Sequence, residues 1–254
     1  MDKFAFITGA TSGFGEATAH KFASNGKNII ITGRRETRLI ELKKVIQHNY
    51  PEINCVISCF DVRNENEVHE AISKLTEDVK NNIDILINNA GLAVGRGPID
   101  QGITDDWERM IDTNVKGLLY VSKAIIPLLK QHKNAHIVNI ASVAGKEVYP
   151  GGNVYCASKH AVDALSKAMR IDLLPYGIKV TNIAPGAADT EFSLVRFKGD
   201  SETAKSVYEG YTPLYAEDVA DAVHYACTRP AHVTINDLVI MPTAQASATN
   251  LIKF

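Results

Sequence analysis

The amino-acid sequence predicts a doubly wound α/β fold built on one parallel β-sheet. Apolar runs of four to seven residues alternate with longer amphipathic stretches, and these runs are apolar nearly throughout. Strands have this character when helices cover both faces of a parallel sheet. The composition is that of a globular domain, since 45% of the 254 residues are hydrophobic and 22% are charged.

Seven strands and six intervening helices are expected. The strand-like runs are 4–8, 28–32, 54–60, 84–88, 136–141, 179–184 and 237–241. Helical periodicity covers 13–25, 36–48, 64–81, 104–131, 153–175 and 216–228. Alternation this regular predicts a single domain over 1–254, of the Rossmann type. Residues 186–212 show no clear periodicity, which in such a fold is typical of a functional lid.

The charge balance and the N-terminus limit the class and the compartment. Lys and Arg number 27 against 29 Asp and Glu, which excludes a polybasic nucleic-acid binder. The segment MDKFAFITGATSG shows no signal-peptide pattern, and no run approaches the roughly 18 apolar residues of a membrane span. We therefore expect a cytoplasmic protein that binds neither nucleic acid nor membrane.

The cysteines and histidines predict neither a disulfide nor a metal site. Cys55 and Cys59 lie on one predicted strand, about 13 Å apart at ~3.3 Å per residue, which is beyond disulfide reach. His132 and His136 straddle a predicted helix end and strand start, so we expect no metal there.

A glycine-rich turn follows the first strand and opens the first helix. Its residues are Gly9, Ala10, Thr11, Ser12, Gly13 and Phe14, followed by Gly15. Glycines let a backbone turn tightly and approach a diphosphate, which then lies at the positive end of the helix. The turn therefore predicts a dinucleotide site.

Two arginines indicate which dinucleotide is bound. The second strand ends with Gly33, Arg34 and Arg35, where an acidic residue would hold the ribose hydroxyls of NAD. A guanidinium group instead suits the 2′-phosphate of NADP. The sequence favours NADP, with a solvated helix start as the alternative.

The next two strand ends face the same crevice. Asp61 and Val62 follow the third strand, and Asp61 could accept from the adenine amino group. Asn88 and Ala90 lie at the end of the fourth strand, in Asn88-Asn89-Ala90-Gly91, where small residues would pass close to the cofactor. A simple turn or cap remains the alternative for each.

An acid–base group is predicted after the fifth strand. Tyr155 and Lys159 share one face of a helix, four residues apart. An ammonium group beside a phenol lowers the phenol pKa toward a range useful for proton transfer. Ser142, at the preceding strand end, can donate to a substrate oxygen.

In these motifs the sequence resembles the short-chain dehydrogenase/reductase family over nearly the whole chain. The matching positions, in order, are TGATSGFG, NNAG, Asn114, Ser142, Tyr155-x-x-x-Lys159 and Pro185-Gly186. The resemblance implies that Tyr155 exchanges a proton with the substrate oxygen, which Ser142 orients. It further implies that Lys159 binds the nicotinamide ribose and that Asn114 supports a proton path through a local helix distortion. Pro185, Gly186 and Thr190 belong to a family motif that binds the cofactor, in which Thr190 would contact the nicotinamide carboxamide.

The C-terminal third resembles the NADP-dependent 3-hydroxy acid dehydrogenases of this family. The resembling segments are 190–193, 195–200, 230–233 and 241–243. Arg196 is a candidate for holding a substrate carboxylate, since its fork suits that group. The alternative is an ion pair of Arg196 with Asp200 or Glu202.

Three functions remain open: a 3-hydroxy acid dehydrogenase, a broad carbonyl reductase for uncharged ketones, and a non-catalytic NADP(H) sensor. The resemblance also implies a homo-oligomer, a dimer or tetramer, with the Tyr155 helix and the 104–131 helix in its interface.

Overall fold

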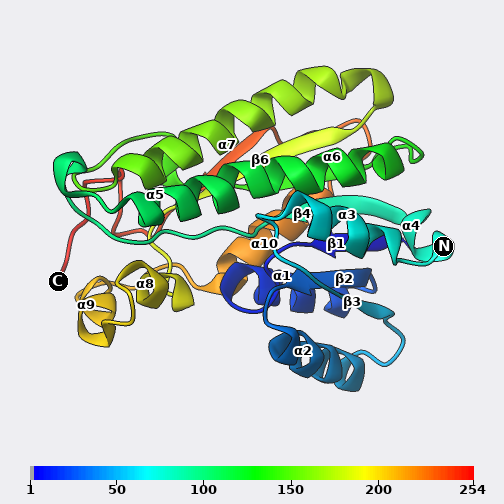
Figure 1. Cartoon of the computed structure of the whole chain (residues 1–254), viewed down its shortest axis with the longest axis horizontal. Helices are drawn as coiled ribbons and strands as arrows, with labels where there is room; N and C mark the ends of the chain where they lie inside the picture. The colour runs from blue at the N-terminus through cyan, green and yellow to red at the C-terminus, as the bar shows by residue number, and fades with distance from the viewer. Residues whose placement is uncertain (1–2) are drawn as a thin grey trace.

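A computed structural model describes residues 3–254, and its seven strands form one parallel sheet (Figure 1). The strand order is β3-β2-β1-β4-β5-β6-β7. The strands are β1 (Phe4–Ile7), β2 (Asn28–Gly33), β3 (Cys55–Cys59), β4 (Ile83–Asn88), β5 (His136–Ile140), β6 (Lys179–Pro185) and β7 (Asp237–Ile240). The predicted doubly wound fold is confirmed, and each predicted strand end is within one residue of the observed one.

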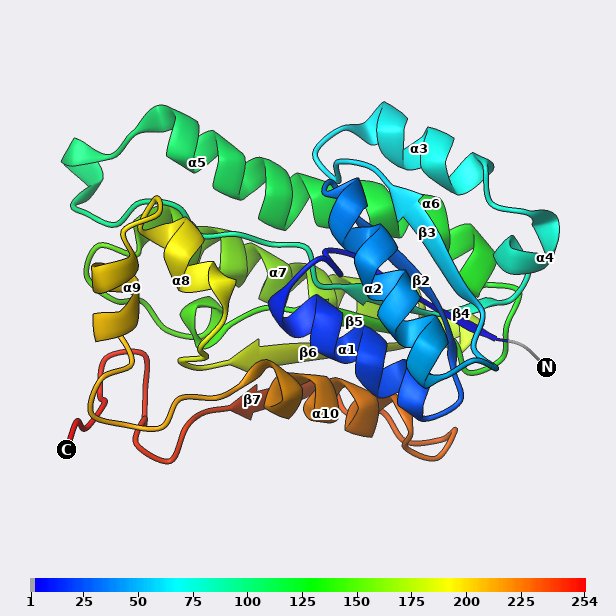
Figure 2. The same ribbon diagram turned by 90° about the horizontal axis from the view of Figure 1, so that it is seen from below.

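Helices cover both faces of the sheet (Figure 2). One face packs against α1 (Gly13–Ser24), α2 (Glu36–Asn49) and α10 (Ala216–Cys227). The other packs against α3 (Glu65–Ser73), α6 (Leu118–Leu129) and α7 (Asn153–Asp172). Both layers are needed because the middle strands are buried on both faces, as in the fully buried β1 and β5.

Two long predicted helices are interrupted. The stretch 64–81 forms α3 and a separate short α4 (Glu77–Lys80), because the Thr76 side chain caps a new helix by accepting from Val79 N–H. The stretch 104–131 forms α5 (Thr104–Ile111), the π-helical turn η2 (Asp112–Gly117) and α6. A π-turn is the kind of local distortion that the family resemblance implies at Asn114.

The aperiodic segment 186–212 contains two short helices. These are α8 (Glu191–Arg196) and α9 (Ser201–Ser206), capped by the side chains of Thr190 and Asp200. They lie beyond the carboxyl end of the sheet, beside the C-terminal segment (Figure 2). Each is too short for hydrophobic periodicity to be recognised in the sequence.

Short 3₁₀ turns complete the chain: η1 (Ile99–Gln101), η3 (Val143–Gly145) and η4 (Leu174–Tyr176). Cys55 and Cys59 lie on β3 as predicted, and all four cysteines are free thiols. Among residues 3–254, no helix is both long and apolar enough to cross a membrane.

Candidate active site

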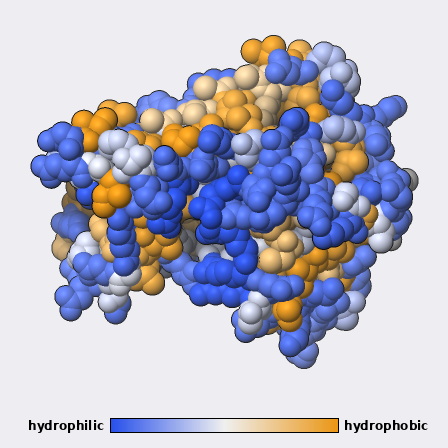
Figure 3. All heavy atoms as spheres, viewed as in Figure 1, coloured by the Kyte–Doolittle hydropathy of each residue, from blue (hydrophilic) through white to orange (hydrophobic). Residues whose placement is uncertain are grey.

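The carboxyl ends of the strands open into a cavity of about 960 Å³. The turn after β1, the ends of β2 to β6, helix α8 of the predicted lid (186–212) and the C-terminal segment all contribute to its walls. In Figure 3 the surface is hollowed between the lid and the part of the molecule that holds α1, and the hollow is strongly hydrophilic. This is the place where open α/β sheets bind ligands.

The glycines of the turn before α1 allow its backbone to pack closely against neighbouring segments. Gly9 and Gly13 have φ of +67° and +55°, and a Cβ on Gly9 would lie 2.9 Å from the Ala90 Cα. Ser12 precedes the helix, but its side chain does not cap the first-turn N–H groups. Thr11, Ser12, Gly13 and Phe14 line the cavity as predicted, whereas Ala10 does not. Ala10 is fully buried in the core beneath α1, so its side chain is not part of the cavity wall.

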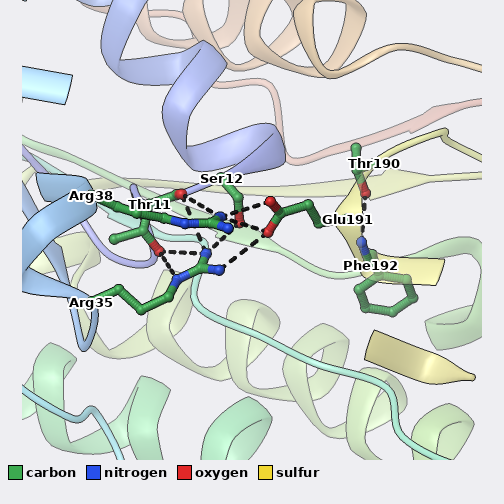
Figure 4. A network of polar contacts seen from close by, with 7 residues as sticks. All are labelled: Thr11, Ser12, Arg35, Arg38, Thr190, Glu191 and Phe192. Atoms are coloured by element: carbon green, nitrogen blue, oxygen red, sulfur yellow. Dashed lines mark hydrogen bonds and ion pairs between the residues drawn. The ribbon is translucent and has the colours of Figure 1, made fainter. Parts of the chain in front are cut away.

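Arg34 and Arg35, which follow β2, line the cavity, and Figure 4 shows Arg35 beside Thr11 and Ser12 of the glycine-rich turn. Arg35 donates from Nη2 to Thr11 Oγ1 at 2.8 Å and to Ser12 Oγ at 2.9 Å. Arg34 lies 3.5 Å from an Asp61 carboxylate oxygen. A third arginine, Arg38, lies one turn after Arg35 on α2, and the sequence analysis did not identify it as part of this cluster. The cluster is therefore cationic and contacts the glycine-rich turn directly.

Asp61 lies in the cavity wall but is already paired. Its carboxylate accepts from Arg63 Nη2 at 2.6 Å, and the hydrogen bonds and charges of Arg63 and Arg34 hold its pKa below the usual range against the effect of burial. Val62 also lines the wall. A carboxylate that stays ionised keeps its acceptor capacity for an amino group.

The Asn88 side chain is buried within the protein and does not lie in the cavity wall. Its side-chain amide donates to Ser122 Oγ and Asn139 Oδ1, both at 2.9 Å, inside the sheet–helix interface. Its neighbour Asn89 and Ala90 line the cavity instead. Successive side chains alternate sides at a strand end, so a shift of one residue exchanges the buried and the exposed position.

Ser142, Tyr155 and Lys159 meet at the centre of the cavity. Ser142 follows β5, and its hydroxyl donates to the Pro185 carbonyl at 3.4 Å. Lys159 donates to the Ile140 carbonyl at 2.8 Å, and its Nζ lies 6.0 Å from the centre of the Tyr155 ring. The structure thus brings together the three side chains that the sequence predicts to carry out proton transfer.

The electrostatics of Tyr155 differ from the sequence expectation. Burial raises the pKa of the phenol, and the Ser142 hydroxyl and the Arg196 charge only partly counter it. Burial also lowers the pKa of Lys159 to about 8. The spacing of Tyr155 and Lys159 predicts a lowered phenol pKa, but desolvation exceeds the influence of an ammonium group 6.0 Å from the ring.

Asn114 lies behind these groups in the π-turn η2. Its Nδ2 donates to the Leu92 carbonyl at 2.8 Å and to Ser158 Oγ at 2.9 Å, and its Oδ1 accepts from Leu92 N–H at 2.8 Å. The π-turn widens the helix locally and so turns this side chain toward α7. Asn114 is almost fully buried and does not line the cavity, so any action on the substrate passes through its neighbours.

Arg196 projects from helix α8 toward Tyr155. Its Nη2 donates to the Tyr149 hydroxyl at 2.8 Å, and its guanidinium carbon lies 5.8 Å from the Tyr155 ring centre. Its Nε is buried without a hydrogen-bond partner. Within residues 3–254 it forms no ion pair with Asp200 or Glu202, so that alternative is wrong, and Tyr149 is a partner that the sequence did not indicate.

Lys198, on the same lid, does not join Arg196. Its Nζ pairs with the buried Asp106 carboxylate at 2.8 Å, while Gly95 N–H donates to the Arg196 carbonyl at 3.0 Å. These two contacts tie the end of α8 to α5 and to the loop after β4. Lys198 therefore anchors the lid rather than contributing a second charge to the substrate end.

The remaining wall comes from segments far apart in the sequence. Pro185, Gly186 and Thr190 line it, and the Thr190 hydroxyl accepts from Phe192 N–H. Gln245, in the C-terminal segment, also lines it and accepts from Ala187 N–H at 2.8 Å. Nothing in the sequence predicted that Gln245 reaches the site. The part of the chain that the structure describes has no group of three or more His, Cys, Asp or Glu able to hold a metal ion.

The chain is similar to known proteins over nearly its whole length. Residues 3–199 match the family model of the short chain dehydrogenases. The chain is 46% identical over 247 residues to sulfoacetaldehyde reductase 2 of Chromohalobacter salexigens, covering 97% of this chain and 96% of that protein. It is 45% identical over 243 residues to the NADP-dependent 3-hydroxy acid dehydrogenase YdfG of Escherichia coli K12, covering 95% and 96%.

Among solved structures, the closed form of a serine dehydrogenase complexed with NADP⁺ superposes with a TM-score of 0.92. The two chains share 44% identity, and the match covers 99% of each.

Proposed function

The chain belongs to the short-chain dehydrogenase family and is an NADP-dependent oxidoreductase, and we propose that it acts on short 3-hydroxy acids or the corresponding semialdehydes. Serine, allo-threonine and 3-hydroxypropionate represent this substrate class. The observation that carries the proposal is the unpartnered, buried Nε of Arg196 beside the catalytic tyrosine. A buried donor without a partner is costly, so a substrate acceptor at this point stabilises the complex.

The residues around the cavity fit a dinucleotide that carries a 2′-phosphate. The backbone at Gly9 and Gly13, which lines the cavity at the start of α1, would accept the diphosphate. Arg34 and Arg35 would hold the 2′-phosphate, and Thr190 would lie at the nicotinamide end. When bound, NADP supplies the hydride chemistry at the carbon that carries the substrate oxygen.

The chain's own residues would manage position and protons. In reduction, the protonated Tyr155 donates to the carbonyl oxygen, which Ser142 holds by a hydrogen bond. In oxidation, the phenolate of Tyr155 takes the hydroxyl proton. Because burial favours the neutral phenol, oxidation is expected to accelerate with rising pH, whereas reduction proceeds at neutral pH. Lys159 and the groups held by Asn114 complete the proton path.

The substrate acid group would bind Arg196. A guanidinium fork accommodates two acceptor oxygens, as a carboxylate or a sulfonate offers. The 46% identity to a sulfoacetaldehyde reductase favours a short sulfonated aldehyde as the second candidate substrate. Both candidates place an anion at Arg196 and an aldehyde or alcohol at Tyr155.

Initial rates test the proposal. Oxidation of L-serine, L-allo-threonine, 3-hydroxypropionate and 3-hydroxyisobutyrate would be followed with NADP and with NAD at alkaline pH. Reduction of malonic semialdehyde, sulfoacetaldehyde and a neutral ketone would be followed with NADPH. Turnover of at least one carboxylic acid with NADP preferred is the expected result.

The other outcomes have distinct meanings. Turnover of the sulfonate alone would select the second candidate. Reduction of neutral ketones alone would assign a broad carbonyl reductase, and binding without any turnover would assign a sensor.

We also infer a cytoplasmic homo-oligomer that contacts itself through α7 and the α5–α6 helices. Ile171 and Leu174, at the end of the α7 layer, are each 74% exposed, and Leu119 on α6 is also exposed. Figure 3 shows apolar residues gathered along the outer side of this layer. Exposed apolar patches of this kind are typical of protein interfaces. Sedimentation equilibrium of the protein tests the assembly.

A further inference from the structure

A carboxylate of the lid already binds the arginines at the cofactor end of the cavity. Glu191, the first residue of α8, accepts from Arg38 Nη1 at 2.7 and 2.8 Å and from Arg35 Nη1 at 3.2 Å. Arg35 and Arg38 both point at this one side chain (Figure 4). The contact joins residues more than 150 positions apart.

The contact has consequences for the recognition of a phosphate. A 2′-phosphate needs guanidinium donors, and Glu191 occupies donors of two of the three arginines near this end of the site. Two anions on the same guanidinium groups also repel each other. The Glu191 side chain is 44% exposed, so it can leave the arginines for water without being buried elsewhere.

The same contact reaches the catalytic end of the cavity. Glu191 is followed directly by Phe192, whose ring centre lies 5.7 Å from that of Tyr155. Glu191 also follows Thr190, whose methyl group faces Gly13 in the glycine-rich turn. The first turn of α8, which begins at Glu191, therefore contacts both ends of the site.

We propose that Glu191 is a cofactor-specificity residue that competes with the 2′-phosphate for Arg35 and Arg38. A dinucleotide with a 2′-phosphate displaces Glu191 and frees the start of α8. A dinucleotide without this phosphate leaves Glu191 bound to Arg35 and Arg38. The proposal rests on NADP being the cofactor, and it adds to the proposed function a coupling between cofactor identity and the lid.

Binding of two small fragments tests the competition without turnover. Calorimetry would measure Kd for 2′,5′-ADP and 5′-AMP with the wild type and with Glu191→Gln. Removing the carboxylate is expected to tighten 2′,5′-ADP about two- to fivefold, the upper part of the range of a surface ion pair, and to leave 5′-AMP unchanged. The matched control is Glu202→Gln, which removes the same charge from the lid at a residue that forms no ion pair within residues 3–254.

Two results separate failure of this proposal from failure of the cofactor assignment. If the wild type prefers 2′,5′-ADP over 5′-AMP but Glu191→Gln binds 2′,5′-ADP equally or more weakly, the competition is refuted and NADP stands. If the wild type does not prefer 2′,5′-ADP, the cofactor assignment itself fails. Arg38→Met is expected to weaken 2′,5′-ADP only, because it removes a donor for the phosphate.

Hydrogen exchange of the lid supplies a second readout. Saturating 2′,5′-ADP is expected to speed amide exchange over residues 191–196 in the wild type, while 5′-AMP leaves it unchanged. In Glu191→Gln, exchange in this segment is already fast and 2′,5′-ADP adds nothing. Slower or unchanged exchange in the wild type with 2′,5′-ADP would show that the phosphate does not separate Glu191 from Arg35 and Arg38.

Discussion

Replacing Arg196 by methionine tests the assignment of the substrate end most directly. The variant keeps a long side chain on α8 but removes the fork that lies beside Tyr155. It also removes the donor to the Tyr149 hydroxyl, while Lys198 and Asp106 still anchor the lid. The expected effect is therefore a loss of acid recognition and not a loss of the lid.

The size of the effect follows from the hydrogen bonds that are lost. A fork on a carboxylate makes two charge-assisted hydrogen bonds, each contributing about 1.5–3 kcal/mol. The half-exposed setting places the sum near the low end, at about 3–4 kcal/mol. Since about 1.4 kcal/mol is a factor of ten, kcat/KM for an acid substrate is expected to fall by roughly 10² to 10³.

A neutral substrate separates recognition from proton transfer. Arg196 also lowers the pKa of Tyr155, so its loss slows oxidation of every substrate to some extent. The assay therefore compares 3-hydroxypropionate with 1,3-propanediol, which has the same chain length without the charge. In Arg196→Met, the ratio of kcat/KM for 3-hydroxypropionate to kcat/KM for 1,3-propanediol is expected to fall by most of the roughly 10²- to 10³-fold loss.

Two control variants test whether the effect is specific to the guanidinium group of Arg196. Lys198→Met removes a lid charge that faces Asp106 and is expected to change both substrates alike. Tyr149→Phe leaves the guanidinium in place and is expected to have a smaller effect than Arg196→Met. A ratio that changes less than threefold in Arg196→Met would refute the anion-binding role of Arg196.

Three further predictions concern other residues. Tyr155→Phe removes the proton-transferring hydroxyl, so kcat is expected to fall by about 10² to 10⁴, with NADPH binding retained in a fluorescence titration; retained turnover would remove Tyr155 from the mechanism. Asn88→Ala removes the donor that the side chains of Ser122 and Asn139 accept from. The free energy of unfolding measured in urea is therefore expected to fall by about 1–3 kcal/mol, while the Kd for NADP stays unchanged. A weaker Kd at unchanged stability would indicate instead that Asn88 contacts the cofactor. Lys159 has a pKa of about 8 in the folded protein, against an ordinary value of 10.5, so above pH 8 the unfolded chain binds more protons than the folded one. The free energy of unfolding is therefore expected to rise by about 1 kcal/mol from pH 7 to 9, relative to Lys159→Met. Parallel curves of stability against pH for the two proteins would contradict the lowered pKa.

Local sequence patterns determined the fold and the catalytic group. Apolar runs separated by amphipathic stretches predict the ends of the seven strands within one residue. The reason is that a strand buried on both faces is apolar at nearly every position. Tyr155 and Lys159 were found because they share one turn of helix, and the glycine-rich turn because its spacing is local. Each of these signals lies within a few residues of chain.

Which side chain faces the cavity was decided only by the tertiary structure. Asn88 and Asn89 are equivalent in the sequence, and the exit of β4 turns one into the core and the other toward the cavity. The orientation of Ala10 depends in the same way on how the turn packs under α1. A local pattern cannot predict these choices because both neighbours satisfy it.

Contacts between distant segments also required the folded molecule. Glu191 meets Arg38 across 153 residues, and Gln245 reaches Ala187 from the C-terminal segment. The raised pKa of Tyr155 has the same origin, since it comes from burial by several segments and outweighs the nearby lysine. The sequence determined which chemical groups the site contains, whereas packing decided their partners and their protonation, because desolvation and long-range pairing depend on what surrounds a group in space.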